Sequence, residues 1–472
     1  MNDSSSARVV DALRTWVGSA APGAQLPSTR ALVAEHGVSP VTVQKALRAL
    51  AAQGVVESRP GVGTFVRLAR THRPADHGWQ TAALGAPRAD LPGAGAMLRS
   101  AAPETHALHV GYPDEELLPA RLVRAGLTRA ARGAAATVRP PSAGLEELRA
   151  WFAGELAELT PAGQPAPTAH DVLVTPGTQG ALTSVFRALV APGETLLVES
   201  PTYWGALLAA RQAGVRVVPV PADADGPEPD GLDRAFRETG ARAFYAQPTY
   251  ANPTGASWTT ARAEQVLDVV VAHGAFLVED DWARDLGIDE STPPHQPLAT
   301  RDPDGHVVHI RSLTKSMSPT IRVGAVVARG PVRDRVQADR AAETLYTSAL
   351  LQQAALEVLT DPGWRTHLRR LRGQLRQRRD LLLAALAEHA PSLSVERVPV
   401  GGIHLWVRLP DGADVARVVA GCEARGVLVG PGDDWYPTEP AGPYLRLTFT
   451  GPGPGGFGEA CAIVEETVRA QA

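Results

Sequence analysis

The chain has 472 residues, of which 44% are hydrophobic and 20% are charged, and its formal net charge is −4 at pH 7. This length is about two to three times that of a common domain, so more than one packed core is expected. The composition excludes a wholly basic nucleic-acid-binding protein, and no apolar run reaches the roughly 18 residues that a membrane-spanning helix needs.

The start of the chain, the cysteines and the distribution of charge bear on the cellular location, on metal or disulfide sites and on the domain organisation. No basic segment leads into an apolar one at the start, which argues against secretion and predicts a cytoplasmic protein. Cys422 and Cys461 lie far from any histidine pair at metal-ligand spacing, so we expect no disulfide and no metal, and interpret both as small core residues. Residues 1–68 carry seven Lys or Arg against four Asp or Glu, a net +3, which leaves −7 for the rest. This difference in charge fits an acidic body that carries a small basic module, and it also fits a chance distribution of charged residues.

Two short helices with a tight turn between them are predicted near the N-terminus. Ser28 can cap a helix that closes at Gly37, and Ser39 can cap a second helix that ends before Gly54. Proline at the first position of the second helix strengthens this interpretation, because its fixed φ suits a helix start.

The second of these helices has the features of a DNA-reading helix. Val43, Leu47 and Leu50 recur at helical spacing and are expected to face the core. The polar and basic side chains that point elsewhere are Thr42, Gln44, Lys45 and Arg48. Donors of this kind suit base edges and phosphates. Two strand-like runs follow, at residues 55–57 and 64–66, and the glycine-rich segment between them predicts a hairpin.

The motifs LPSTR (26–30), GVSPVTV (37–43) and GVGTFV (61–66) occur in this order, and residues 8–67 resemble the GntR-type winged helix-turn-helix. The resemblance implies an α+β domain over residues 1–68 that binds double-stranded DNA at a promoter or operator. The DNA contacts that it implies are Ser28, Arg30, Thr42, Lys45 and Gly63. A small helical cap or protein-interaction module is the alternative.

A linker and a larger domain are predicted next. Residues 69–103 are rich in proline, glycine and alanine without a sustained period, which is typical of a linker. From about residue 171 onward, β-branched runs alternate with helical stretches, which predicts a largely parallel sheet covered by helices. These runs are VLVT, TLLVES, VRVVPV, AFYAQ, FLVED and HVVHIRS. A long helix over residues 364–388, with strands near 402–409 and 444–450, predicts a smaller C-terminal α+β subdomain.

Residues with the chemistry of a cofactor site follow successive strands. Lys315 comes three residues after the end of HVVHIRS, where burial lowers the pKa of an amine and suits it to Schiff-base formation. The helix start after Gly177 offers free backbone N–H groups to a phosphate. Tyr203 can stack on a planar heterocycle, and Asn252 can bind a phenolic oxygen. Asp280 can keep a pyridine nitrogen protonated and so make the ring an electron sink.

These residues resemble the class I/II aminotransferases, over roughly residues 79–470, and we assign residues 104–472 to this domain. The resemblance implies the α/β architecture of PLP fold type I and pyridoxal 5'-phosphate as cofactor. It implies that Lys315 is the internal aldimine lysine, with the catalytic role, and that Arg446 receives the α-carboxylate of a substrate or effector. The other cofactor contacts that it implies are Gly177, Thr178, Gln179, Tyr203, Asn252, Asp280, Ser312 and Arg322.

Some positions depart from the aminotransferase pattern. Trp282 and Ala283 stand where a tyrosine is usual, so we expect Asn252 to be the only direct partner of the ring hydroxyl. Arg139 stands where another tyrosine usually reaches the phosphate of the partner subunit. These departures bring the reactivity of the site into question.

A GntR-type winged helix joined to a whole aminotransferase-like domain is similar to the MocR subfamily of bacterial regulators. The resemblance implies a homodimeric transcription regulator that senses PLP, alone or with a small amino compound, through an aldimine on Lys315. We expect little or no physiological turnover, and no membrane partner. Two alternatives remain open: a working aminotransferase whose DNA module is secondary, and a constitutive DNA-binding protein whose large domain is only structural.

Overall fold

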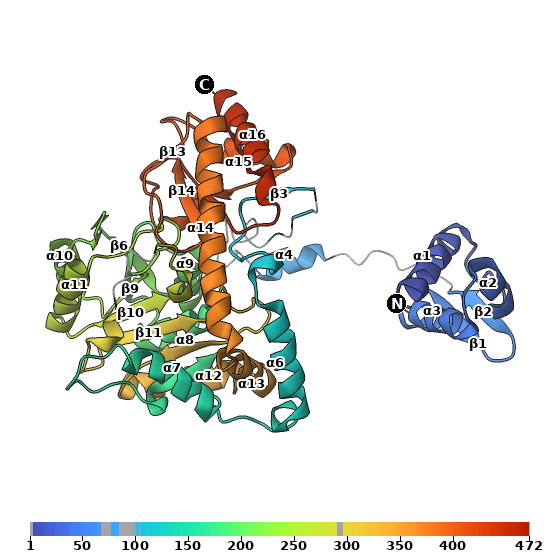
Figure 1. The fold of residues 1–472 in the computed structure, drawn as a ribbon, viewed down its shortest axis with the longest axis horizontal. Helices are drawn as coiled ribbons and strands as arrows, with labels where there is room; N and C mark the ends of the chain where they lie inside the picture. The colour runs from blue at the N-terminus through green and yellow to red at the C-terminus, as the bar shows by residue number, and fades with distance from the viewer. Residues whose placement is uncertain are drawn as a thin grey trace. The chain divides into compact units, whose positions relative to one another are not determined.

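The structure is a computed structural model, and it describes residues 3–67, 77–84, 99, 101–102, 104–289 and 296–471. The chain forms two compact units that divide between residues 88 and 89 (Figure 1). Most of the predicted linker, residues 69–103, lies outside the described residues. Within the described ranges, no helix combines the length and the apolar character that crossing a bilayer requires.

The first unit consists of helices and one hairpin. Its elements are α1 (Asp3–Ser19), α2 (Thr29–His36), α3 (Pro40–Ala52), β1 (Val56–Arg59), β2 (Gly63–Val66) and α4 (Gly78–Leu84). The Ser28 hydroxyl accepts a hydrogen bond from the Ala31 N–H, and the Ser39 hydroxyl accepts one from the Thr42 N–H. Gly37 closes α2 in the left-handed conformation. Both predicted serine caps and the predicted turn are therefore confirmed.

An aliphatic core joins the helices of this unit to its hairpin. Val43, Ala46 and Leu50 of α3 are fully buried, and Leu47 is half-buried against the same core. The predicted core face of this helix is confirmed, and Ala46 is the member that its spacing did not identify. Strands β1 and β2 pair antiparallel, with Arg59 opposite Gly63 at the tip. The predicted hairpin is therefore also confirmed.

A seven-stranded sheet forms the centre of the second unit, in the order β4-β12-β11-β10-β9-β5-β6. These strands are β4 (Val172–Thr175), β5 (Thr195–Glu199), β6 (Arg216–Val220), β9 (Ala243–Ala246), β10 (Phe276–Asp281), β11 (Val307–Ser312) and β12 (Gly324–Val327). Strand β12 is antiparallel to both of its neighbours, and the pairs among β5, β6, β9, β10 and β11 are parallel. The largely parallel sheet was predicted, whereas β12 was missed because its short apolar run directly follows the lysine motif.

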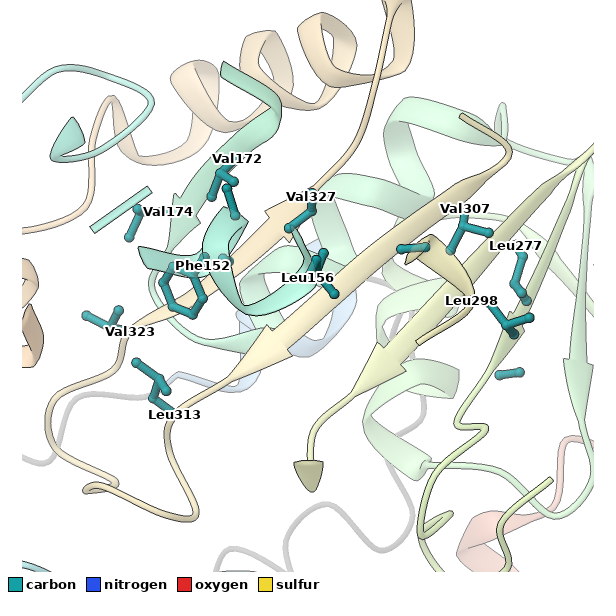
Figure 2. Packing of buried hydrophobic residues seen from close by; sticks show 14 of the residues in the cluster. Phe152, Leu156, Val172, Val174, Leu277, Leu298, Val307, Leu313, Val323 and Val327 are labelled. Atoms are coloured by element: carbon teal, nitrogen blue, oxygen red, sulfur yellow. The ribbon is translucent and has the colours of Figure 1, made fainter. Parts of the chain in front are cut away.

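Helices cover both faces of this sheet (Figure 1). They are α6 (Ala120–Arg132), α7 (Glu146–Ala157), α8 (Thr178–Leu189), α9 (Trp204–Ala213), α10 (Pro229–Thr239), α11 (Thr260–Ala272), α12 (Pro331–Thr344) and α13 (Ala349–Leu359). Side chains along β11 alternate between two apolar cores, since Val307 lies in one, and Val308 and Ile310 lie in the other. Figure 2 shows the first core, where Phe152 and Leu156 of α7 lie among strand side chains. Burial on both faces explains the apolar runs of these strands.

A smaller α+β subdomain completes the second unit. Its antiparallel sheet has the order β13-β14-β17-β16, with β13 (Ser394–Val395), β14 (His404–Arg408), β16 (Gly430–Pro431) and β17 (Tyr444–Thr448). The helices that pack with it are α14 (Gly363–His389), α15 (Val415–Ala424) and α16 (Phe457–Arg469). Short pairs elsewhere join β3 (His106–Ala107) to β15 (Val427–Leu428), and β7 (Ala222–Asp223) to β8 (Gly226–Pro227). The predicted long helix is confirmed as α14, and Cys422 and Cys461 are buried core residues as predicted.

Candidate functional site

A cavity of about 270 Å³ lies at the carboxyl ends of the parallel strands, where ligands of open α/β sheets bind. Nine of the ten residues predicted to bind the cofactor or a carboxylate line it: Thr178, Gln179, Tyr203, Asn252, Asp280, Ser312, Lys315, Arg322 and Arg446. The tenth, Gly177, lies against Arg322. The structure therefore brings together, in one cavity, predicted residues that are as far as 268 positions apart in the sequence.

The amine of Lys315 lies in the cavity, with Nζ 3.5 Å from the centre of the Tyr112 ring. Burial, together with the positive charges of Arg446 and Arg322, lowers the pKa of this amine to about 7. The carboxylate of Asp280 acts in the opposite direction. A large fraction of Lys315 is therefore unprotonated, and nucleophilic, at neutral pH.

Asp280, near the end of β10, holds one carboxylate oxygen in place and leaves the other without a partner. Its Oδ2 accepts hydrogen bonds of 2.8 Å from the Tyr245 hydroxyl and from Gln247 Nε2. Its Oδ1 is buried and has no hydrogen-bond partner among the described residues. Burial raises the pKa of Asp280 to about 6, which reflects this incomplete solvation. A protonated ring nitrogen would supply the missing donor, so the carboxylate fits a pyridine-type cofactor.

The start of α8 and the side chain of Arg322 form an anion cradle. Gly177 is the N-cap residue of α8, and no side chain caps the helix, so its first N–H groups are available to a ligand. A Cβ at Gly177 would lie 2.6 Å from Arg322 Nη2, so only glycine allows this approach. Arg322 itself has a φ of 49°, a conformation that non-glycine residues adopt at a cost. Ser312 lies in the same cavity, and its Oγ accepts a hydrogen bond from the Thr314 N–H.

Gln179 and Tyr203 are hydrogen-bonded to each other at the N-terminus of α9. The Tyr203 hydroxyl donates to Gln179 Oε1 at 3.3 Å, and Gln179 Nε2 donates to the Gly205 carbonyl at 2.7 Å. These bonds fix the tyrosine ring on the cavity wall, where it can stack on a planar ligand. Because the Gln179 side chain is engaged in this way, its contribution to a phosphate site would come from its backbone N–H.

Arg446, on β17, is almost completely buried, at 2% exposure. Its Nη2 donates to the His109 carbonyl at 2.5 Å, its Nη1 donates to Asn252 Oδ1 at 3.4 Å, and its guanidinium lies 4.8 Å from the Trp435 ring centre. Burial lowers its pKa to about 9, and the charge of Asp434 acts in the opposite direction. Trp435 Nε1 also donates to Asn252 Oδ1, so a hydrogen bond from Asn252 to a ligand would come from its NH2 group.

Several residues of the cavity were not identified from the sequence. They are Gly111, Tyr112, Trp204, Leu208, Gln247, Thr314 and His404. Gln247 stands five positions before Asn252, and its side chain accepts from the Asn252 N–H while donating to Asp280, so it connects two predicted residues. Tyr112 lies just beyond the predicted linker, where no periodic pattern marks it. Trp282 lines the cavity, whereas Arg139 lines a separate surface groove.

The predicted DNA-contact residues are placed on the first unit. Ser28, Arg30 and Lys45 are exposed, and Thr42 is half-buried, with its hydroxyl 2.9 Å from that of Ser39. Gly63 has a φ of 144°, and a Cβ there would overlap the Gln25 side chain.

The hairpin adds one basic residue that sequence reasoning did not single out. Arg59 lies opposite Gly63, and its guanidinium is 4.7 Å from the Phe65 ring centre. Glu57 also pairs with it. Arg59 therefore places a cation at the exposed tip of the hairpin.

Comparisons with known families match both units. Residues 5–66 match the family of bacterial regulatory proteins of the gntR type, and residues 110–460 match the family of class I and II aminotransferases. The HTH-type transcriptional regulator YdfD of Bacillus subtilis is 26% identical over 90% of this chain and 88% of its own. The 2-aminoadipate transaminase of Thermus thermophilus is 30% identical over 72% of this chain and 84% of its own.

Solved structures resemble the second unit. LysN, an α-aminoadipate aminotransferase from Thermus thermophilus, was solved in complex with N-(5'-phosphopyridoxyl)-L-leucine and aligns with a TM-score of 0.72. It is 26% identical, and the alignment covers 83% of this chain and 98% of that one. The predicted architecture, a winged helix followed by a PLP fold type I domain, is therefore confirmed.

Proposed function

The chain belongs to the aminotransferase class I and II family and carries a GntR-type DNA-binding domain, so we propose that it is a transcriptional regulator whose large domain is the sensor. The large domain senses PLP, alone or with a small amino compound. The observation that carries this proposal is the cavity around Lys315, which joins a reactive amine, an unpaired carboxylate oxygen and an anion cradle. Relatives that span both domains are named as regulators of the HTH type.

Pyridoxal 5'-phosphate is the cofactor indicated by the family and by the chemistry of the cavity. When bound, it supplies an electrophilic carbon that captures amines reversibly. Lys315 would hold it covalently, Asp280 would pair with its ring nitrogen, and Tyr203 would stack on its ring. Arg322 and the N-terminus of α8 would bind its phosphate.

Regulation requires that the ligand distinguish two arrangements of the protein. A ligand shifts an equilibrium only by the difference in its affinity for the two states. An amino acid whose amine displaces Lys315 and whose carboxylate engages Arg446 would change contacts in both the large sheet and the C-terminal subdomain, because these residues belong to different subdomains. We propose that this change alters how a homodimer binds promoter DNA in the cytoplasm.

A working aminotransferase is the second candidate. It is favoured by the unprotonated state of Lys315 near neutral pH and by the buried guanidinium of Arg446 in the same cavity. Sustained, multiple turnover of amino and keto acids by the purified protein would support this reading. A single half-turnover at most, together with ligand-dependent DNA binding, would support sensing.

The proposal is tested by measuring both activities on one preparation. The absorbance of the bound cofactor reports occupancy of the cavity, and the fluorescence anisotropy of a DNA fragment from upstream of the gene reports binding. We expect PLP to change the affinity for DNA over the same concentration range in which it binds the protein. Binding of PLP with no change in DNA affinity would contradict the proposal.

A further inference from the structure

Two aromatic side chains of the cavity hold buried nitrogen atoms with no hydrogen-bond partner among the described residues. They are His404 Nε2 and Trp282 Nε1, and both side chains line the cavity together with Lys315 and Arg446. Their rings are 5.9 Å apart between centres and are tilted by 32°. His404 is 4% exposed and Trp282 is 7% exposed. Buried polar groups without partners are uncommon in folded proteins, and each calls for an explanation.

The backbone places this pair beside the carboxylate-binding arginine. His404 begins β14 and pairs with Thr448, and Trp406, two residues later, pairs with Arg446. Because side chains alternate along strands and paired positions point to the same face, His404 and Arg446 lie on one face of this sheet. Trp282 follows β10 directly, two positions after Asp280. The pair therefore lies where the C-terminal subdomain meets the end of the large sheet.

The surroundings of His404 keep its imidazole neutral. Burial lowers its pKa well below the usual value, and the charges of Arg446 and Lys315 lower it further. A neutral imidazole offers one donor and one acceptor, and an indole offers one donor. Two uncharged hydrogen-bonding groups thus stand next to a guanidinium that suits an α-carboxylate.

We propose that His404 and Trp282 form a subsite that binds the side chain of an uncharged, polar α-amino acid while Arg446 holds its α-carboxylate. This inference rests on the proposed sensing function and names the chemical class of its effector. An amide or hydroxyl side chain would give both buried nitrogens a partner. An aliphatic side chain would leave them unpaired, which is unfavourable for a buried polar group.

Charged side chains fit the subsite poorly. A second carboxylate would be buried beside uncharged donors, since the α-carboxylate already occupies Arg446. A side-chain ammonium would share the cavity with the positively charged guanidinium of Arg446. A buried charge without an opposite charge is strongly unfavourable.

The experiment compares amino acids of matched size on the full-length protein loaded with PLP. One set is L-asparagine, L-aspartate and L-leucine, and the other is L-glutamine, L-glutamate and L-methionine. The change in absorbance of the bound cofactor gives a half-saturation concentration for each. We expect the amide of at least one set to bind at least about tenfold more tightly than both of its counterparts, the effect of one buried hydrogen bond. Equal or tighter binding of the acidic or aliphatic member in both sets overturns the inference.

Variants connect this preference to the two residues. His404→Phe and Trp282→Phe keep an aromatic ring and remove the nitrogen, so we expect each to reduce the preference to within about threefold. Trp151→Phe is the control, because Trp151 lies on α7, packs against the apolar core under the large sheet and does not line this cavity. Unchanged preference in both His404→Phe and Trp282→Phe contradicts the subsite.

The outcomes separate this inference from the proposed function. A response to amino acids without preference for any class contradicts the subsite and leaves sensing intact. No response to any amino acid, with PLP bound and DNA affinity unaffected, contradicts both. If a variant fails to retain PLP, the preference of the unmodified protein still decides.

Discussion

Replacing Gly177 by alanine tests the anion cradle at its tightest contact. The added Cβ would lie 2.6 Å from Arg322 Nη2, so the guanidinium must move. If Arg322 loses one charge-assisted hydrogen bond to the phosphate, affinity for PLP falls by about 1.5–3 kcal/mol, or about 10- to 150-fold. Alanine in the backbone conformation of Gly177, with φ 86° and ψ 172°, also adds about 1–3 kcal/mol of strain to the folded state of the variant.

Gly193 provides a matched control for this substitution. It also has a φ of 86°, but a Cβ there meets nothing within 4 Å. Gly193→Ala should therefore lower the free energy of unfolding and leave affinity for PLP unchanged, as measured by absorbance titration. A double-mutant cycle completes the test: in an Arg322→Ala background, Gly177→Ala should have little further effect on PLP affinity. Additive losses, or wild-type affinity in Gly177→Ala, would refute the cradle.

Other predictions concern the amine and the DNA-binding unit. Lys315→Ala should lose PLP on gel filtration while its circular dichroism is unchanged; co-elution of stoichiometric PLP would contradict this. Because the pKa of Lys315 is lowered to about 7, the amine is unprotonated above that pH, so the stopped-flow rate of PLP capture should rise between pH 6 and 8, and a flat or falling profile would contradict the assignment. Arg30→Ala and Lys45→Ala should each weaken DNA binding, measured by anisotropy. Each should also reduce, by about 1, the slope of the logarithm of the DNA-binding constant against the logarithm of the salt concentration; unchanged slopes would exclude phosphate contacts. Leu50→Ala removes a fully buried side chain at a cost of about 2–5 kcal/mol, so it should reduce DNA binding without changing the cofactor absorbance, and full DNA binding would contradict its place in the core.

The sequence predicted most strongly those features that have local causes. Ser28 and Ser39 were identified as caps because a hydroxyl before an apolar-periodic run is a direct helix signal, and both hydroxyls accept the expected N–H. Lys315 and Asp280 were identified because each lies at or just beyond the carboxyl end of an apolar run, and parallel strands end at one edge of the sheet.

Features that depend on contacts between distant segments were not accessible in this way. Tyr112 lies against Lys315 although 203 positions separate them, and no local pattern announces that contact. The sequence around His404 is that of an ordinary strand start. Only the structure shows that His404 lines the cavity together with Trp282 and Arg446. Strand β12 was missed because four apolar residues after a functional motif resemble a continuation of the loop.

The effect of PLP on DNA binding, in the unmodified protein and in Lys315→Ala, tests the central claim most directly. We predict that saturating PLP changes the DNA dissociation constant of the unmodified protein by about 5- to 150-fold, the usual range of coupling between sites, and leaves that of Lys315→Ala unchanged. Equal DNA affinities of the unmodified protein with and without PLP, or an equal shift in the variant, would contradict the claim that the cavity around Lys315 controls the DNA-binding domain.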